Sequence, residues 1–115
     1  MADPLRGEIW VTDFDPVRGH EQGGRRPALV ISVDAFNLGP ARLVMVLPLS
    51  TRPKRASSHV LVEPPEGGLN QRSYIRCEDI RSISHERLIE RWGRVTETTL
   101  YATEMRLRIL IGLQS

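Results

Sequence analysis

Cysteine, aromatic residues and long apolar runs are all scarce in this sequence. Cys77 is the only cysteine among 115 residues, so no internal disulfide can form, and no Cys/His spacing is typical of a zinc or haem site. No segment has the roughly 20 apolar residues of a membrane-spanning helix, and the first residues lack the apolar stretch of an export signal. These absences predict a cytoplasmic protein that does not enter a membrane.

Aromatic residues make up only 5% of the chain, whereas hydrophobic residues of all kinds make up 40%. The core must therefore consist mainly of Val, Leu and Ile, and this composition favours short β elements. A chain of this length fits one domain. We expect a single domain over residues 1–115.

Lysine is nearly absent as well. Lys54 is the only lysine, and the other fifteen basic side chains are arginines. The planar arginine fork suits phosphate groups and base edges, although a GC-rich genome produces the same bias. The net charge of +2 is compatible with nucleic-acid binding but does not demonstrate it.

Short apolar runs between Gly, Pro and Asp residues predict a series of β-strands. The run at 42–49 is the most continuous and predicts a buried central strand, with Pro48 near its end. The predicted strands span residues 7–13, 28–33, 42–49, 59–62, 73–78, 80–84 and 88–95.

Two helical segments are also predicted. Residues 34–37 form one turn with Asp34 as its cap, and residues 96–112 form an amphipathic helix that Thr96 caps. The helix covers the sheet with a periodic face made of Leu100, Thr103, Leu107, Leu110 and Ile111. Since no β-α-β alternation occurs, the predicted fold class is mainly β with a C-terminal helix, as a small antiparallel barrel or a strongly curled sheet.

A polar segment between the first two predicted strands holds His20, Glu21, Arg25 and Arg26. An imidazole is a proton carrier that can be tuned near neutral pH, and guanidinium groups supply fixed positive charge, as phosphate chemistry requires. Three glycines and the lack of a hydrophobic period predict that residues 17–26 form an irregular, mobile loop.

A second polar group lies on the predicted strand 73–78. Tyr74, Arg76 and Glu78 share one face of this strand, while Cys77 faces the other way as a core residue. Arg76 and Glu78 can present a cation and a carboxylate to one site. They can equally form cross-strand ion pairs with little effect on chemistry.

Five motifs follow one another along the chain. They are R-G-E-I-W at 6–10, D-P at 15–16, G-H-E-Q-G-G-R-R-P at 19–27, P-L-S-T at 48–51 and R-C-E-D-I-R-S-I at 76–83. Together they resemble the MazF/PemK family of toxin endoribonucleases, from Arg6 through the C-terminal helix. The resemblance implies an SH3-like β-barrel homodimer from a type II toxin-antitoxin system, which cuts single-stranded RNA at short sequences without a metal or other cofactor. It also implies a MazE-like antitoxin whose extended acidic segment covers the RNA site, with operator DNA reached only through that antitoxin.

The resemblance assigns site residues by position. Arg26 matches the arginine of the family's R-P motif, and Ser50 lies where many relatives carry the threonine of the catalytic pair. The His, Arg and Asp set proposed for the PemK branch, also called Kid, maps onto His20, Arg76 and Glu78. Serine in place of threonine keeps the hydroxyl but loses the methyl group that restrains it, and glutamate in place of aspartate places its carboxylate one methylene farther out.

Each of these residues also has a simpler interpretation. Arg26 can clamp a phosphate or pair with a carboxylate on a strand edge, and Ser50 can donate to the same phosphate or cap a turn. His20 can act as general acid or base, and Glu21 can act as base or orient a guanidinium, but both can be merely solvated.

A further set of side chains is expected to attract RNA phosphates, or else to form a solvated basic loop. They are Arg25, Thr51, Arg52, Lys54 and Arg55. His59 and His85 lie outside the motifs and are expected to be structural or exposed. Trp10 is expected to pack in the core or a dimer rather than to stack on a base.

The predicted activity is RNA cleavage in which the 2′-hydroxyl attacks the adjacent phosphate, giving a 2′,3′-cyclic phosphate and a free 5′-hydroxyl. Two alternatives remain open. The chain can be a non-catalytic RNA- or DNA-binding barrel that acts with its antitoxin as a co-repressor. It can also be a CcdB-like toxin that binds DNA gyrase, although such an inhibitor would not need the arginine and hydroxyl set.

Overall fold

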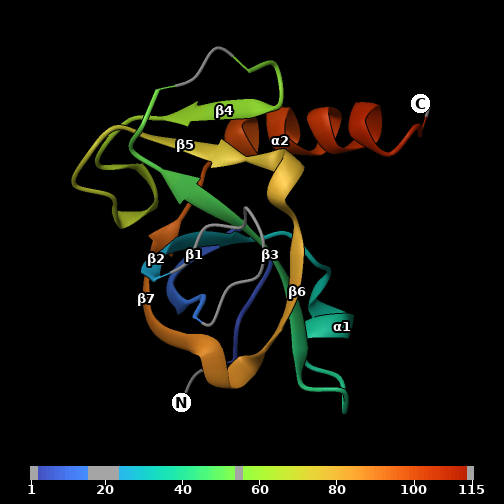
Figure 1. The fold of residues 1–115 in the computed structure, drawn as a ribbon. Coiled ribbons are helices and arrows are strands. Elements are labelled where there is room, and N and C mark those ends of the chain that lie inside the picture. Colours follow the sequence, from blue (N-terminus) through green and yellow to red (C-terminus); the bar gives the residue numbers. More distant parts are fainter. Residues whose placement is uncertain (1–2, 16–23, 54–55, 114–115) are drawn as a thin grey trace.

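The structure is a computed structural model and describes residues 3–15, 24–53 and 56–113. In these ranges the chain forms one curved sheet with a long helix packed against it (Figure 1). The strands are β1 (Glu8–Asp13), β2 (Arg25–Val30), β3 (Leu43–Ser50), β4 (His59–Val62), β5 (Ser73–Arg76), β6 (Arg81–Ser84) and β7 (Leu88–Arg94). The helices are α1 (Asp34–Asn37), α2 (Glu97–Leu110) and the short 3-10 helices η1 (Glu66–Gly68), η2 (Cys77–Asp79) and η3 (His85–Arg87).

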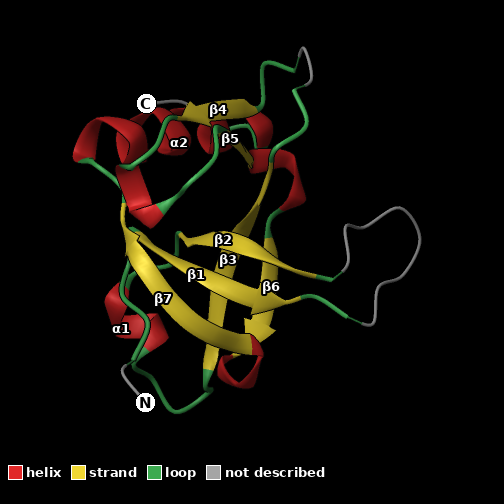
Figure 2. Cartoon of the chain, turned by 90° about the vertical axis from the view of Figure 1, so that its left-hand side faces the viewer, coloured by secondary structure: helices red, strands yellow, loops and turns green. Residues whose placement is uncertain are grey.

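All strand pairs are antiparallel, in the order β4-β5-β3-β2-β1-β7, with β6 also paired to β3. The predicted class, mainly β with a C-terminal helix, is confirmed. Within the described ranges no ladder joins β4 to β7, so the sheet is open, and β4 and β5 lie across the end of the other strands (Figure 2). Neither α1 nor α2 is long and apolar enough to span a bilayer.

The strand β3 has two partners along a single edge. Its first half pairs with β6, where Val46 lies opposite Arg81, and its last two residues pair with β5, where Ser50 lies opposite Tyr74. The helix η2 connects β5 to β6 and therefore lies beside the middle of β3. This arrangement places the polar residues of η2 against the edge of β3.

Apolar side chains form two layers because successive residues of a strand point to opposite faces. One layer contains Ile9, Leu29, Leu47 and Leu49 and is covered by Leu100 and Leu107 of α2. The other layer lies on the opposite face and consists of Trp10, Phe14, Ala28, Val30, Val44, Val46, Ile83 and Leu88. Both layers are aliphatic in the main, as the composition predicts.

Several local predictions are confirmed. The strand at 59–62 is found with the predicted bounds, Pro48 lies near the end of β3, and that strand is buried over most of its length. Thr96 caps α2, because its hydroxyl accepts a hydrogen bond from the backbone N–H of Thr99 at 3.2 Å. Trp10 and Cys77 are buried, as expected of core residues.

Two predictions about the helices are wrong. The N-cap of α1 is Val33, and the Asp34 carboxylate instead accepts the backbone N–H of Arg6 at 2.7 Å. Leu110 and Ile111 are 46% and 64% exposed, since the end of α2 extends past the sheet (Figure 1).

The predicted loop 17–26 extends too far toward the C-terminus, because β2 begins at Arg25. Arg25 and Arg26 already belong to β2, where they pair with Asp13 and Thr12 of β1, and this pairing extends the strand beyond its apolar run. The strand ends earlier than predicted, at Val30 instead of Val33. Residues 16–23 lie outside the described part of the chain.

The R-G-E-I-W motif has a structural role at the start of β1. Glu8 is only 2% exposed, and its Oε1 accepts hydrogen bonds from the backbone N–H of Leu5 at 2.8 Å and from the indole N–H of Trp10 at 3.0 Å. Its Oε2 pairs with Arg91 of β7 at 3.1 Å. A buried carboxylate of this kind is tolerated because each oxygen has a partner.

The Glu8 contacts predict a stability effect with a matched control on the same pair of strands. We expect Glu8→Ala to lower the free energy of unfolding by about 1–3 kcal/mol, because the buried Trp10 indole loses its acceptor. Glu90 accepts the indole N–H of Trp92 at 3.0 Å with the same spacing, but at the surface, so Glu90→Ala should cost less than about 0.5 kcal/mol. Urea unfolding of both variants measures the difference, and equal losses would contradict the role of Glu8.

Candidate active site

A row of polar residues crosses the sheet at the end of β3. Arg26 of β2 lies opposite Thr12 of β1, and Ser50 lies opposite Tyr74 of β5. The register that places Ala28 opposite Pro48 brings Ser50 opposite Arg26 when it is continued by two residues. Directly opposed residues of antiparallel strands point to the same face, so the side chains of Arg26, Ser50 and Tyr74 share one face.

This face is the one that carries the second apolar layer. Ala28 and Val30 follow Arg26 by alternation in β2, and Val44 and Val46 lead to Ser50 in β3. The apolar side chains anchor both strands, and the same alternation then presents a guanidinium and a hydroxyl where the layer ends. Ser50 is 7% exposed, and Arg26 is half-buried.

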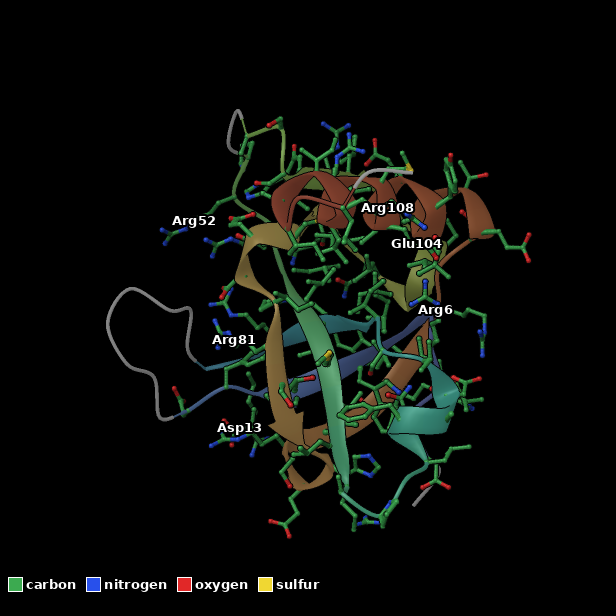
Figure 3. The ribbon with its side chains drawn as sticks, turned by 90° about the vertical axis from the view of Figure 1, so that its right-hand side faces the viewer. Arg6, Asp13, Arg52, Arg81, Glu104 and Arg108 are labelled. Atoms are coloured by element: carbon green, nitrogen blue, oxygen red, sulfur yellow. The ribbon has the colours of Figure 1, made fainter. Side chains whose placement is uncertain are left out.

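Four arginines from different parts of the chain surround this point. Burial lowers the pKa of Arg26, and the nearby positive charges of Arg76, Arg81 and Arg52 lower it further, while Asp79 acts in the opposite direction. Arg52 follows β3, Arg76 ends β5 and Arg81 begins β6, and Figure 3 shows Arg52 and Arg81 on the same side of the molecule. We refer to Arg26, Arg52, Arg76 and Arg81 as the arginine cluster. Such a concentration of positive charge suits an anion such as phosphate.

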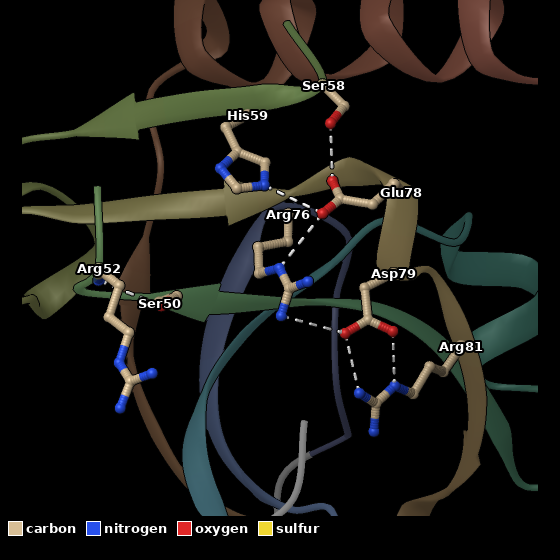
Figure 4. A network of polar contacts seen from close by, with 8 residues as sticks. All are labelled: Ser50, Arg52, Ser58, His59, Arg76, Glu78, Asp79 and Arg81. Carbon is tan, nitrogen blue, oxygen red and sulfur yellow. Dashed lines mark hydrogen bonds and ion pairs between the residues drawn. The ribbon is translucent and has the colours of Figure 1, made fainter. Parts of the chain in front are cut away.

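Glu78 is held from two elements (Figure 4). Its Oε1 accepts the hydroxyl of Ser58 at 2.8 Å, and its Oε2 lies 3.0 Å from Nε2 of His59 and 3.3 Å from Nε of Arg76. Burial raises the pKa of Glu78, but the hydrogen bonds with His59 and Ser58 outweigh burial and lower the pKa to about 2. The carboxylate is therefore ionised at neutral pH and oriented toward Arg76.

Asp79 faces two members of the arginine cluster. Arg81 donates to both of its oxygens, from Nε at 3.1 Å and from Nη2 at 2.9 Å, and Nη1 of Arg76 lies 3.8 Å from Oδ2 (Figure 4). The Arg81 guanidinium also lies over the ring of Phe14, 4.6 Å from its centroid. Two successive carboxylates, Glu78 and Asp79, thus contact opposite ends of the Arg76 guanidinium.

Ser50 makes the contact that its simpler interpretation predicts, since the backbone N–H of Arg52 donates to its Oγ at 3.1 Å. This contact caps the turn after β3. It is compatible with binding phosphate, because a hydroxyl that accepts one hydrogen bond can still donate its own proton. Thr51 is exposed in the same turn.

The structure brings together five of the residues that the sequence predicts for the site. They are Arg26, Ser50, Arg52, Arg76 and Glu78. The predicted strand 73–78 ends at Arg76, because the chain turns through η2 to reach β6, and Glu78 lies on η2. Arg25 is exposed and alternates to the face opposite Arg26. His20, Glu21, Lys54 and Arg55 lie outside the described residues.

Three residues of the site have no predicted role. Asp79 and Arg81 occur within the motif at 76–83, where their spacing of two residues is the signal that could have identified them. His59 is buried and lies opposite Arg76 in the pairing of β4 with β5, so its contact with Glu78 depends on that register and not on a local pattern. The structural interpretation of His59 and His85 agrees with their burial.

The described part of the chain has no group of three or more His, Cys, Asp or Glu side chains placed to hold a metal ion. Cys77 is buried between the site residues Arg76 and Glu78, and burial raises the pKa of its thiol to about 11. The thiol is therefore protonated at neutral pH, and Cys77 belongs to the core layer under α2.

Known proteins resemble this chain over nearly its whole length. A family model described as "PemK-like, MazF-like toxin of type II toxin-antitoxin system" matches residues 5–111. Endoribonuclease MazF9 of Mycobacterium tuberculosis is 36% identical over 115 residues, which covers 96% of this chain and 98% of that protein. Endoribonuclease MazF of Staphylococcus epidermidis is 31% identical over 111 residues, covering 96% of this chain and 92% of that protein.

Solved structures show the same likeness. MazF from Deinococcus radiodurans has a TM-score of 0.86 and 31% identity, covering 98% of this chain and 100% of that chain. A chain in a MazE-MazF structure from the same organism has a TM-score of 0.80 and 30% identity, covering 99% and 100%. The sequence and structural matches span the strands and turns that carry the arginine cluster, and they show that this chain belongs to the PemK-like, MazF-like family of toxins from type II toxin-antitoxin systems.

Proposed function

We propose that this chain is a sequence-specific, metal-independent endoribonuclease that acts on single-stranded RNA in the cytoplasm. The observation that carries the proposal is the arrangement of Arg26 and Ser50 on one sheet face, within the positive field of Arg52, Arg76 and Arg81. The names of the relatives, which are endoribonucleases, support it. In the reaction, the 2′-oxygen forms a bond to phosphorus while the bond from phosphorus to the 5′-oxygen breaks. The products are a 2′,3′-cyclic phosphate and a 5′-hydroxyl.

Arg26 is the group that we assign to the phosphate. Its guanidinium is half-buried and can donate two parallel hydrogen bonds to non-bridging oxygens, where negative charge develops in the transition state. Ser50 lies opposite Arg26 when the register of β2 and β3 is continued by two residues, and it can donate a third hydrogen bond. A lowered pKa does not discharge Arg26 at neutral pH, because an arginine begins far above that range.

Glu78 orients Arg76 in this proposal and does not transfer a proton. A carboxylate with a pKa of about 2 is a weak base at neutral pH, and three neighbours already hold its oxygens. The proton steps therefore need other groups. The sequence offers His20, which the family resemblance also selects, and Glu21 for these steps, one removing the 2′-hydroxyl proton and the other protonating the 5′-oxygen.

The proposal includes a homodimer and an antitoxin. Apolar side chains at the end of α2, among them Ile109, Ile111 and Leu113, are more than half exposed and can support self-association. Figure 3 shows Arg6, Glu104 and Arg108 together beside α2, to the right of Arg52 and Arg81. An extended acidic segment of a MazE-like antitoxin fits a cluster of this charge, in line with the solved MazE-MazF assembly of a relative.

RNA cleavage tests the proposed function directly. We expect purified protein to cut a long unstructured RNA at discrete sites in excess EDTA, and Arg26→Gln to lower the rate constant about 10²- to 10³-fold through the loss of phosphate stabilisation. Arg42→Gln is the matched control, because Arg42 is exposed and precedes the opposite end of β3 from Ser50. Cleavage that needs an added metal, or that Arg26→Gln leaves intact, would contradict the proposal. Binding of RNA with an intact backbone would favour a co-repressor instead.

Glu78 predicts a pH dependence of stability. Its pKa is about 2 in the folded protein and about 4.3 in an unfolded chain. Its contribution is therefore complete above the unfolded value and is lost as the pH falls through the folded value. We expect Glu78→Gln to lower the urea midpoint at pH 6 and to have progressively less effect between pH 4 and pH 2.

Glu63 provides the control for this measurement. It pairs with Arg72 at 2.8 Å, but both side chains are more than half exposed. Glu63→Gln should change the midpoint little at any pH, because an exposed pair contributes little. A Glu78→Gln effect of constant size from pH 6 to pH 2 would show that the lost stability does not come from the ionised carboxylate.

A further inference from the structure

One carboxylate, that of Asp79, lies between two members of the arginine cluster, Arg76 and Arg81 (Figure 4). Its side chain is 15% exposed, its oxygens accept two hydrogen bonds from Arg81, and Nη1 of Arg76 is 3.8 Å away. The negative charge of Asp79 also acts on Arg26 and opposes the lowering of its pKa. Asp79 therefore interacts with three of the four arginines.

The position of Asp79 is fixed from two directions. Its backbone belongs to η2, which β5 and β6 hold against the edge of β3. Its partner Arg81 is held over Phe14 and pairs through its backbone with Val46 of β3. The fork of hydrogen bonds between Arg81 and Asp79 fixes the plane of the carboxylate as well as its position.

The contact with Arg76 differs from the contact with Arg81. At 3.8 Å it is an ion pair that is longer than a hydrogen bond, whereas Arg81 donates at 2.9 Å and 3.1 Å. Arg76 can therefore turn Nη1 toward another anion without losing a hydrogen bond to Asp79. A phosphate oxygen offers the same acceptor chemistry as the Asp79 carboxylate.

We propose that Asp79 is a positioning residue, which keeps Arg76 oriented in the free protein and competes with the RNA phosphate for it. The inference rests on the proposed function of the same site. It predicts opposite changes in affinity and turnover when the charge of Asp79 is removed. Binding becomes tighter because a competing anion is lost, and turnover becomes slower because the Arg76 guanidinium loses its orientation.

The test measures binding and turnover separately. The binding probe is a fluorescein-labelled 2′-O-methyl RNA of random sequence, whose blocked 2′-oxygen prevents cleavage. We expect Asp79→Asn to lower the Kd of this probe about three- to tenfold and to lower kcat on a cleavable RNA at least tenfold. Asp3→Asn is the matched control, since Asp3 is exposed before β1 and its replacement changes the net charge equally. It should change neither quantity more than twofold.

Asp79→Glu provides a second variant that keeps the charge. Its carboxylate still competes for Arg76, so we expect a Kd near that of the natural chain, but its extra methylene disturbs orientation and lowers kcat. A purely structural role would instead weaken binding and turnover together in both variants. That result, or an unchanged Kd in Asp79→Asn, would overturn the inference while leaving the proposed function intact.

Two further outcomes are informative. If the natural chain neither binds the probe nor cleaves RNA, the proposed function fails, and this inference fails with it. If Asp79→Asn is unfolded at the assay temperature by its melting curve, Asp79→Glu decides alone. Loss of affinity in Asp79→Glu would then overturn the inference, and a kcat loss at constant Kd would support it.

Discussion

Two carboxylates on successive residues, Glu78 and Asp79, offset the positive charge of four neighbouring guanidinium groups. The arginines repel one another, and this repulsion contributes to the lowered pKa of Arg26. Glu78 and Asp79 offset it by contacting Nε and Nη1 of Arg76. Each carboxylate is itself held by side chains from another strand, so the charge balance depends on β4, β5 and β6 being correctly placed.

The fold meets that requirement through the two partners of β3. Because β5 and β6 share one edge of β3, the chain must turn between them, and the turn η2 carries both carboxylates. The ladder between β2 and β3 then sets Arg26 and Ser50 on the same face as Arg76. The apolar layer that contains Trp10 and Phe14 lies on that face. The ring of Phe14 also packs against the Arg81 guanidinium. Arg81 therefore contacts both the apolar layer, through Phe14, and the carboxylate of Asp79.

Much of this site could be predicted from local patterns, because alternation and motifs act over a few residues. Arg76 and Glu78 were identifiable from their spacing of two residues, although Glu78 lies on η2 and not on the predicted strand. Arg26 and Ser50 were identifiable from the resemblance. His59 was not, since its contact with Glu78 exists only once β4 pairs with β5. The predicted start of β2 was wrong because backbone pairing with β1 begins at Arg25, before the apolar run of the strand. Ile111 has the helical periodicity of a residue that covers the sheet, but it lies beyond the sheet.

The central claim is that Arg26 and Ser50 hold one RNA phosphate between them. A crystal structure of the protein with an uncleavable 2′-O-methyl RNA tests it most directly. We expect a single phosphate with oxygens within about 3.2 Å of both the Arg26 guanidinium and Ser50 Oγ, and with Arg76 turned toward it. RNA bound elsewhere on the molecule, with no phosphate in contact with Arg26 or Ser50, would contradict the claim.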